Sequence, residues 1–180
     1  MTPVSGPVVI EPFDPARHDR AGFSSGTDQV DNFLKKSANK LSKADNLRVF
    51  AMVDAAGALI GFYAMNAHAI DYTDLPARFA RTRPGNGCIP AAFISMIGVD
   101  SRYQGRGYGG DLLVDCLSRI LRASGKIGVA VVMLDILDCG DPVLVAKRTR
   151  LYQSYGFVAL ASNPLRLFLP LATIRALLQD

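Results

Sequence analysis

The sequence predicts a mixed α/β domain, of the α/β or α+β class, built around one mixed sheet. Helical patterns alternate with continuously apolar strands in the middle of the chain, and hairpin patterns flank them. A length of 180 residues fits one compact unit, so we expect a single domain over residues 1–180. Hydrophobic residues make up 49% and charged residues 20%, which indicates a globular chain.

The N-terminal part predicts a strand, a helix and a hairpin in that order. Residues 8–13 have a strand-like pattern that ends at two prolines. A helix is expected to start after Thr27 as N-cap, because acids fill its first turn and lysines follow. Its apolar residues at helical spacing are Val30, Phe33, Leu34, Ala38 and Leu41. Two β-rich runs, 47–54 and 58–70, then flank an Ala-Ala-Gly turn and predict the hairpin.

Residues 71–90 break this periodicity with three prolines and two glycines, and a loop of this length in a compact domain is usually functional or partly disordered. We expect a short helix over 75–80 within it. The rest of the chain again alternates in pattern. We expect strands at 91–100, 129–137, 157–160 and 165–171, and helices at 111–124, 142–155 and 173–179.

The segment 99–110 carries the clearest chemical signal. It lies between a buried strand and an amphipathic helix, and its glycines allow backbone N–H groups to face a ligand. With the free donors of the helix N-terminus, this predicts an anion site suited to a pyrophosphate, and Arg102 and Arg106 are expected to contact further phosphate oxygens.

Two nucleotide-binding motifs fit this segment poorly. The letters of the dinucleotide fingerprint GxGxxG occur at Gly105, Gly107 and Gly110, but in mid-chain and without the expected acid after the next strand. The P-loop pattern is absent from the sequence. A glycine-rich turn that merely precedes a helix remains an alternative.

The pattern Gln104-x-x-Gly107-x-Gly109 resembles the pyrophosphate-binding motif of the GNAT acetyltransferase superfamily. This resemblance implies acetyl-coenzyme A as cosubstrate and a mixed, mostly antiparallel sheet with splayed central strands and flanking helices. It also implies that the end of the preceding strand pairs with the pantetheine arm. The implied cofactor-binding residues are Ile97, Gly98, Val99, Gln104, Gly105, Arg106, Gly107, Tyr108, Gly109 and Gly110.

The segment 151–157 resembles the FYxxxGF element of the same superfamily, which implies that Tyr152 is the catalytic residue near the coenzyme sulfur. A phenol can donate a proton to the leaving thiolate. The alternative is that Tyr152 and Tyr155 only cover the core face of their helix. No distinctive general base stands out, since the single glutamate, Glu11, lies in the first strand. The α-amino group of an aminoacyl ester is partly neutral near physiological pH without a base.

A narrower resemblance concerns GNAT toxins of bacterial toxin–antitoxin systems, which acetylate aminoacyl-tRNA and block translation. It rests on Phe23-Ser24-Ser25-Gly26, Val30-to-Lys36, Ile60-Gly61-Phe62-Tyr63 and the elements above. It implies a homodimer and a ribbon-helix-helix antitoxin as partners. Ser25 stands where these toxins have cysteine, and the strand 94–99 lacks their usual arginine.

This resemblance makes two groups of basic residues candidates for contacts with the tRNA backbone. The alternative is that lysines on an amphipathic helix only keep the protein in solution. The candidate residues are Lys35, Lys36, Lys40, Lys43, Arg78, Arg81 and Arg83. Two further hypotheses stay open: an N-acetyltransferase of small amines or protein N-termini, and an acyl-CoA-binding or nucleic-acid-binding module without turnover.

The three cysteines, Cys88, Cys116 and Cys139, have neither disulfide nor zinc spacing, so we expect no metal and a core role for Cys116. A cysteine hydrolase is the weakest hypothesis, because both histidines are far from these thiols in sequence. The sequence contains no membrane-spanning stretch and no signal peptide pattern, which predicts a cytoplasmic protein.

Overall fold

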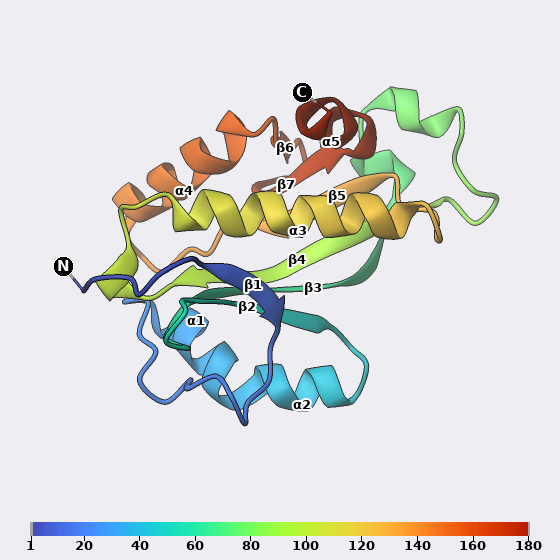
Figure 1. The fold of residues 1–180 in the computed structure, drawn as a ribbon. Coiled ribbons are helices and arrows are strands. Elements are labelled where there is room, and N and C mark those ends of the chain that lie inside the picture. Colours follow the sequence, from blue (N-terminus) through green and yellow to red (C-terminus); the bar gives the residue numbers. More distant parts are fainter. Residues whose placement is uncertain (1, 180) are drawn as a thin grey trace. The chain divides into compact units, whose positions relative to one another are not determined.

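The computed structural model describes residues 2–179, and its elements follow the predicted order (Figure 1). The strands are β1 (Val9–Pro12), β2 (Arg48–Val53), β3 (Leu59–Asp71), β4 (Cys88–Val99), β5 (Val131–Asp135), β6 (Val158–Leu160) and β7 (Asn163–Pro170). The helices are α1 (Asp28–Asn32), α2 (Ala38–Lys43), α3 (Tyr108–Ser124), α4 (Pro142–Ser154) and α5 (Leu171–Leu178).

Within residues 2–179 the strands form a seven-stranded sheet in the order β1-β2-β3-β4-β5-β7-β6. Pairs β1–β2, β2–β3, β5–β7 and β6–β7 are antiparallel, whereas β4 and β5 are parallel. The register of the parallel pair runs from Ala91↔Val131 to Ile94↔Leu134, and β4 continues for five residues, 95–99, past its last pair. The predicted mixed, mostly antiparallel sheet is confirmed.

The chain forms two compact units, to both of which β3, β4 and α3 contribute residues. Unit 1 comprises residues 2–66 and 95–116, and unit 2 comprises 67–94 and 117–179. Unit 1 contains the β1–β2–β3 strands and the helical segment from α1 to α2. Unit 2 contains β5, β6 and β7 with α4 and α5.

In unit 1 the hairpin turn between β2 and β3 is built by one carboxylate. The buried side chain of Asp54 accepts hydrogen bonds from the N–H groups of Ala56 at 3.0 Å and Ala58 at 2.9 Å. It also accepts one at 2.9 Å from Ser5, which ties the N-terminal segment to the turn. Gly57 has φ +82°, the left-handed conformation that the Ala-Ala-Gly sequence favours here. These backbone hydrogen bonds, the Ser5 bond first, hold the pKa of Asp54 below its ordinary value.

The helix predicted after Thr27 is a single helical segment interrupted by a π-helical turn, Phe33–Ser37, between α1 and α2. Val30, Leu34 and Ala38 are buried, four residues apart, as the apolar pattern predicts. Thr27 occupies the N-cap position but makes no side-chain capping bond. A widened turn of this kind rotates the residues after it relative to those before it, which sequence periodicity does not show.

Two glycines allow the elements of unit 1 to approach each other closely. A Cβ atom built on Gly98 would lie 2.4 Å from Val30 Cγ1 of α1 and 3.4 Å from the Phe62 ring. A Cβ atom on Gly61 would lie 2.8 Å from the carbonyl oxygen of Gly98. The Phe23 and Phe62 rings fill the remaining space edge to face, with centroids 5.5 Å apart. Close packing of α1 on the end of β4 therefore depends on a missing side chain.

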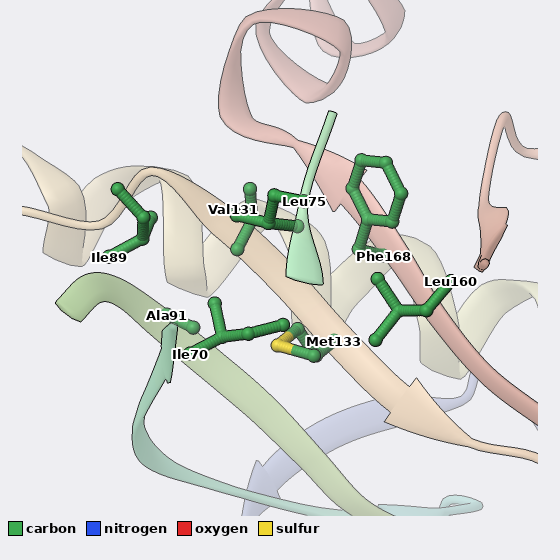
Figure 2. Packing of buried hydrophobic residues seen from close by; sticks show 8 residues of the cluster. All are labelled: Ile70, Leu75, Ile89, Ala91, Val131, Met133, Leu160 and Phe168. Atoms are coloured by element: carbon green, nitrogen blue, oxygen red, sulfur yellow. The ribbon is translucent and has the colours of Figure 1, made fainter. Parts of the chain in front are cut away.

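Unit 2 has its own apolar cluster, which Figure 2 shows around the central strand β5. Val131 and Met133 on β5 are fully buried, and Leu75 from the 71–87 connection packs against them. The cluster consists of Ile70, Leu75, Ile89, Ala91, Val131, Met133, Leu160 and Phe168. The remaining apolar residues of β5, Val132 and Leu134, are buried as well, which explains why this strand is apolar on both faces.

The start of helix α4 is set by an acidic N-cap residue and a proline in the first helical position. Asp141 is the N-cap, and its carboxylate accepts hydrogen bonds from the N–H groups of Val143 at 3.0 Å and Leu144 at 3.4 Å. Pro142 occupies the first helical position, where its missing N–H costs nothing. After α4, Gly156 has φ +96° and turns the chain into β6.

Replacing Gly98 with alanine is expected to destabilise the fold, because the added Cβ would overlap Val30 Cγ1 at 2.4 Å. Overpacking of this kind costs about 1–3 kcal/mol of unfolding free energy. Urea denaturation of Gly98→Ala beside Gly128→Ala measures it. Gly128 has open space around it and no positive φ, so its alanine variant should be nearly neutral. Equal stability of both variants would contradict this packing argument.

Candidate functional site

The predicted anion site in unit 1 is a glycine loop followed directly by the N-terminus of α3. A 3₁₀ turn, Ser101–Tyr103, follows β4, and α3 begins at Tyr108. Gly105 and Gly107 adopt φ +78° and +86°, and a Cβ atom on either would meet nothing within 4 Å. Since protein atoms do not fill this space, the glycines serve the backbone conformation and leave room beside it. The first N–H groups of α3 have no partner within the helix, as at any helix start.

A buried carboxylate anchors the start of this loop. Asp100 is 1% exposed and accepts hydrogen bonds from the N–H groups of Ser24 at 3.1 Å and Arg102 at 3.0 Å. The Arg102 guanidinium forms a two-pronged ion pair with it, with distances of 2.8 and 3.1 Å. Burial raises the pKa of Asp100, but the hydrogen bonds from Arg102 and Ser24 outweigh it and hold the pKa below its ordinary value. The carboxylate is therefore charged and fully occupied.

The two loop arginines are held by the protein itself. Arg102 is engaged by Asp100, so it is less available for a phosphate than the sequence predicts. Arg106 donates hydrogen bonds to the carbonyl oxygens of Thr2 at 2.7 Å and Arg102 at 3.2 Å. Both guanidinium groups lie over the buried Tyr103 ring, at 5.5 and 5.6 Å from its centroid. The Nε atom of Arg106 is buried without a hydrogen-bond partner, which leaves one donor of this predicted site residue unused.

Gln104, the first residue of the predicted motif, uses its side chain to brace the loop. Its Nε2 donates to the carbonyl oxygens of Val99 at 2.9 Å and Ser25 at 2.8 Å. The structure therefore brings the predicted residues Val99 and Gln104 together. Because the side-chain amide of Gln104 already donates to these carbonyls, an anion would bind to the backbone N–H groups of the loop.

These features fit the pyrophosphate of acetyl-coenzyme A. The loop has bare backbone, open space at Gly105 and Gly107, and the positive end of a 17-residue helix. Its one buried acid is neutralised by Arg102, so it does not repel an anion. Ile97, Gly98 and Val99 lie at the half-buried end of β4 beyond its pairing with β5. Backbone groups of a strand that has run past its neighbour are suited to amide partners such as pantetheine.

Tyr152, the predicted catalytic residue, lies in unit 2 on the last turn of α4. Its side chain is 8% exposed and packs edge to face on Phe157, with ring centroids 5.9 Å apart. The Tyr152 carbonyl oxygen accepts hydrogen bonds from the N–H groups of Tyr155 and Phe157, and these two bonds close the turn that contains Gly156. Tyr155 is half-buried. The FYxxxGF-like segment thus forms one compact corner that holds the Tyr152 ring in place.

The single glutamate is unsuited to act as a general base. Glu11 Oε1 lies 2.8 Å from His18 Nε2 and 2.8 Å from Arg17. Because His18 Nδ1 accepts the N–H of Asp14 at 2.9 Å, its Nε2 is the nitrogen that donates to Glu11. The hydrogen bond from His18, followed by the charge of Arg17, holds the pKa of Glu11 below its ordinary value. A carboxylate stabilised in this way is a weak base.

The two basic groups lie on different parts of the fold. Lys36, Lys40 and Lys43 are exposed and Lys35 is half-buried, all along the helical segment of unit 1. Arg78, Arg81 and Arg83 are exposed in the connection between β3 and β4 in unit 2. There Arg83 lies over the Tyr72 ring at 4.5 Å and Arg78 over Phe79 at 5.1 Å.

Two residues of this site have no role assigned from the sequence, although both lie in the toxin-like segments near the N-terminus. Ser25 and Asp31 are joined by two hydrogen bonds of 2.7 Å, from the N–H and the hydroxyl of Ser25 to Asp31 Oδ1. The signal that could have found them is the pair of hydrogen-bonding residues six positions apart at a glycine turn before a helix. Ser25 therefore does more than fill the position of a cysteine.

The thiols and other possible metal ligands are dispersed. Cys116 is fully buried, as predicted for a core residue, whereas Cys88 and Cys139 are exposed. Across residues 2–179, no group of three or more His, Cys, Asp or Glu side chains is arranged to hold a metal ion. None of the helices in the same range combines the length and hydropathy needed to cross a membrane.

Comparison with known proteins identifies similar sequences. A curated relative from Sinorhizobium fredii (strain NBRC 101917 / NGR234), named "Probable toxin TacT", is 63% identical over 171 residues, 94% of either chain. A "tRNA-acetylating toxin" from Mycobacterium tuberculosis (strain ATCC 25618 / H37Rv) is 30% identical over 162 residues, 90% of this chain and 92% of that one. No family-level sequence model matches the chain.

Solved structures share the fold. A tyrosine-to-phenylalanine mutant of KacT superposes with a TM-score of 0.83 at 23% identity, covering 94% of this chain and 98% of that one. AtaT complexed with acetyl-methionyl-tRNAfMet gives a TM-score of 0.82 at 21% identity, covering 96% and 99%. AtaTR bound with AcCoA gives a TM-score of 0.80 at 22% identity, covering 95% and 98%. The GNAT fold predicted from the sequence is confirmed.

Asp100→Asn is expected to lower the unfolding free energy near neutral pH by about 1–3 kcal/mol, because Arg102 loses the negative charge of the carboxylate with which it pairs. The folded-state pKa lies below the ordinary 3.8, so this contribution is present above pH 3.8 and is lost as the pH falls through the folded-state value. Urea unfolding of both proteins across this range measures the difference. A difference that stays constant into strong acid would refute the assignment.

Proposed function

This chain belongs to the family of GNAT toxins that acetylate aminoacyl-tRNA, and we propose that it transfers acetyl from acetyl-coenzyme A to the α-amino group of charged tRNA and so blocks translation. The observation that carries the proposal is the 63% identity to a probable toxin over almost the whole chain. The glycine loop before α3 supports it, because its bare backbone suits the cosubstrate. The chain is an acetyltransferase that we propose to act as one domain over residues 1–180.

The chemistry needs few protein groups. The neutral amine attacks the thioester carbonyl, the carbon–sulfur bond breaks, and the coenzyme leaves as a thiolate that takes up a proton. The amine nitrogen releases one proton to water as the amide forms, which balances the proton that the thiolate takes up. We assign that proton to the Tyr152 hydroxyl, since a phenol with an ordinary pKa near 10 can protonate a thiolate. The backbone N–H near Val99 is assigned to the developing oxyanion. The amine, with an ordinary pKa of ~7.7–8.0, supplies enough neutral form without a protein base.

The cosubstrate is assigned to the end of β4 and the loop that follows it. Ile97, Gly98 and Val99 would pair with the pantetheine arm. Gln104, Gly105, Arg106, Gly107, Tyr108, Gly109 and Gly110 would surround the pyrophosphate. The open space at Gly105 and Gly107 and the unused Nε donor of Arg106 support this assignment.

The proposed macromolecular partners follow from the same family. Charged tRNA would contact Lys35, Lys36, Lys40 and Lys43 on the helical segment and Arg78, Arg81 and Arg83 on the connection. Solved structures of the same fold include a tyrosine-to-phenylalanine mutant of the AtaT toxin bound to the C-terminus of the antitoxin AtaR and acetyl-CoA, and a KacTA–DNA complex. We propose an antitoxin of the ribbon-helix-helix class, a homodimer, and action in the cytoplasm, where charged tRNA is used.

Tyr152→Phe is expected to lower the rate of acetyl transfer to charged tRNA by ~100-fold or more, because the leaving thiolate loses its acid. The measurement is radiolabelled acetyl transfer to total charged tRNA beside an uncharged control, with the affinity for acetyl-coenzyme A measured separately and expected to be unchanged. Tyr155→Phe is the matched control, since Tyr155 lies three residues away on the same turn. Label in uncharged tRNA would refute the α-amino group as the acceptor. Full activity of Tyr152→Phe would refute Tyr152 as the proton donor. Transfer to small amines alone would point to the other acetyltransferase class.

Replacing Lys36, Lys40 and Lys43 together with glutamine is expected to weaken tRNA binding and to reduce its dependence on salt. Each lost phosphate contact lowers the slope of log K against log salt by roughly 0.7–0.9. Filter binding at several salt concentrations measures the slope, and acetyl-coenzyme A affinity serves as the control for folding. An unchanged slope would show that these exposed lysines only solvate the helix.

A further inference from the structure

Outside the residues already assigned, unit 1 contains a continuous chain of hydrogen bonds from α1 to the glycine loop. Asp31 Oδ1 accepts both the N–H and the hydroxyl of Ser25, each at 2.7 Å. The Ser25 carbonyl in turn accepts Gln104 Nε2 at 2.8 Å, and the same Nε2 reaches the Val99 carbonyl at 2.9 Å. The side chain of Gln104 therefore bridges the end of β4 and the Ser25 segment.

The chain of bonds fixes Ser25 tightly. Its hydroxyl also accepts the N–H of Thr27 at 3.2 Å, so the Asp31 bond and the Thr27 bond together set the side-chain rotamer. The following residue, Gly26, has φ +84° and turns the chain into α1. The glycine conformation does not by itself fix the direction of the Ser25 carbonyl, so that direction depends on the hydrogen bonds of Ser25.

A second connection joins the same segment to the loop without involving Asp31. The Ser24 N–H donates to Asp100 at 3.1 Å, and the Ser101 N–H donates to the Ser24 carbonyl at 2.8 Å. These bonds keep the segment beside the loop when Asp31 is changed. Replacing Asp31 should therefore change how firmly the loop backbone is held in its position and leave the fold intact.

We propose that Asp31 is a positioning residue for acetyl-coenzyme A, acting through Ser25 and Gln104 on the loop that binds the pyrophosphate. This inference rests on the proposed function and assigns a role to a residue that contacts no reacting atom. The charged carboxylate of Asp31 makes strong hydrogen bonds to Ser25 at 2.7 Å. Only part of the free energy lost with these bonds affects the loop, because the effect passes through Gln104. The expected effect of removing the carboxylate is a ~3- to 10-fold rise in the Kd for acetyl-coenzyme A.

The experiment compares four variants by isothermal titration with acetyl-coenzyme A and by thermal unfolding without it. Asp31→Ala removes both acceptor oxygens, and Asp31→Asn keeps one oxygen that can accept from Ser25. Ser25→Ala removes the hydroxyl and tests the same chain of bonds from its other partner. Asp28→Ala is the matched control, because Asp28 is the other acid of the first turn of α1 and is exposed. It removes the same favourable charge from the helix N-terminus.

The expected result is a raised Kd in Asp31→Ala and Ser25→Ala, a value near wild type in Asp31→Asn, and no change in Asp28→Ala. At saturating acetyl-coenzyme A, kcat and the KM for charged tRNA should stay close to wild type. If Asp31→Ala does not fold, the Kd of Ser25→Ala decides. An unchanged Kd in that variant or in a folded Asp31→Ala would overturn the inference, as would an equal rise in Asp28→Ala. Absence of acetyl-coenzyme A binding by the wild type would instead overturn the proposed function.

Discussion

The buried carboxylate of Asp100 is the interaction on which the arrangement of unit 1 depends. It lies where β4 ends and the glycine loop begins, and a buried charge is tolerated only if it is paired and hydrogen-bonded. Arg102 supplies the opposite charge, and the N–H groups of Ser24 and Arg102 supply further donors. Satisfying this one group therefore draws together the strand end, the loop and the segment before α1.

The consequence for the site is that its polar side chains bind groups of the protein, which leaves the loop backbone for a ligand. Arg102, Gln104 and, in part, Arg106 bind carbonyl or carboxylate oxygens of the same chain. What remains for a ligand is the glycine backbone and the start of α3. Such a site recognises a pyrophosphate by fixed dipoles that need no rearrangement on binding. A cosubstrate shared by many acetyltransferases can be held in this way while the acceptor is selected elsewhere.

The catalytic chemistry places equally modest demands on the chain. Glu11 is engaged by His18 and Arg17, so it supports the β1 region and is unsuited to act as a general base. An amine that is partly neutral at physiological pH removes the need for a base, which leaves protonation of the thiolate as the step that benefits from a side chain. Tyr152 suits that step because Phe157 and the Gly156 turn hold its ring in one orientation.

The sequence by itself determined the order of elements, the mixed sheet and the family, because these depend on local patterns. Apolar runs such as that of β5, the helical spacing of Val30, Leu34 and Ala38, and the glycines before α3 are visible without a structure. The same is true of the Tyr152 corner, where a glycine and aromatic residues are close in sequence. Local conformational preferences and short motifs were enough for these elements.

Only the tertiary structure decided the contacts between segments far apart in the chain. The pairing of Ser25 with Gln104 spans 79 residues, and that of Ser24 with Asp100 spans 76. The π-helical turn at Phe33–Ser37 and the clash that a side chain on Gly98 would cause also escaped the pattern. Which partner satisfies a hydrogen-bonding group depends on which segments packing brings within about 3 Å, and residue types alone do not specify that distance. Arg102 shows that burial also decides a contact within a short segment: its sequence position suggested a phosphate ligand, whereas the buried Asp100, two residues earlier, became its partner.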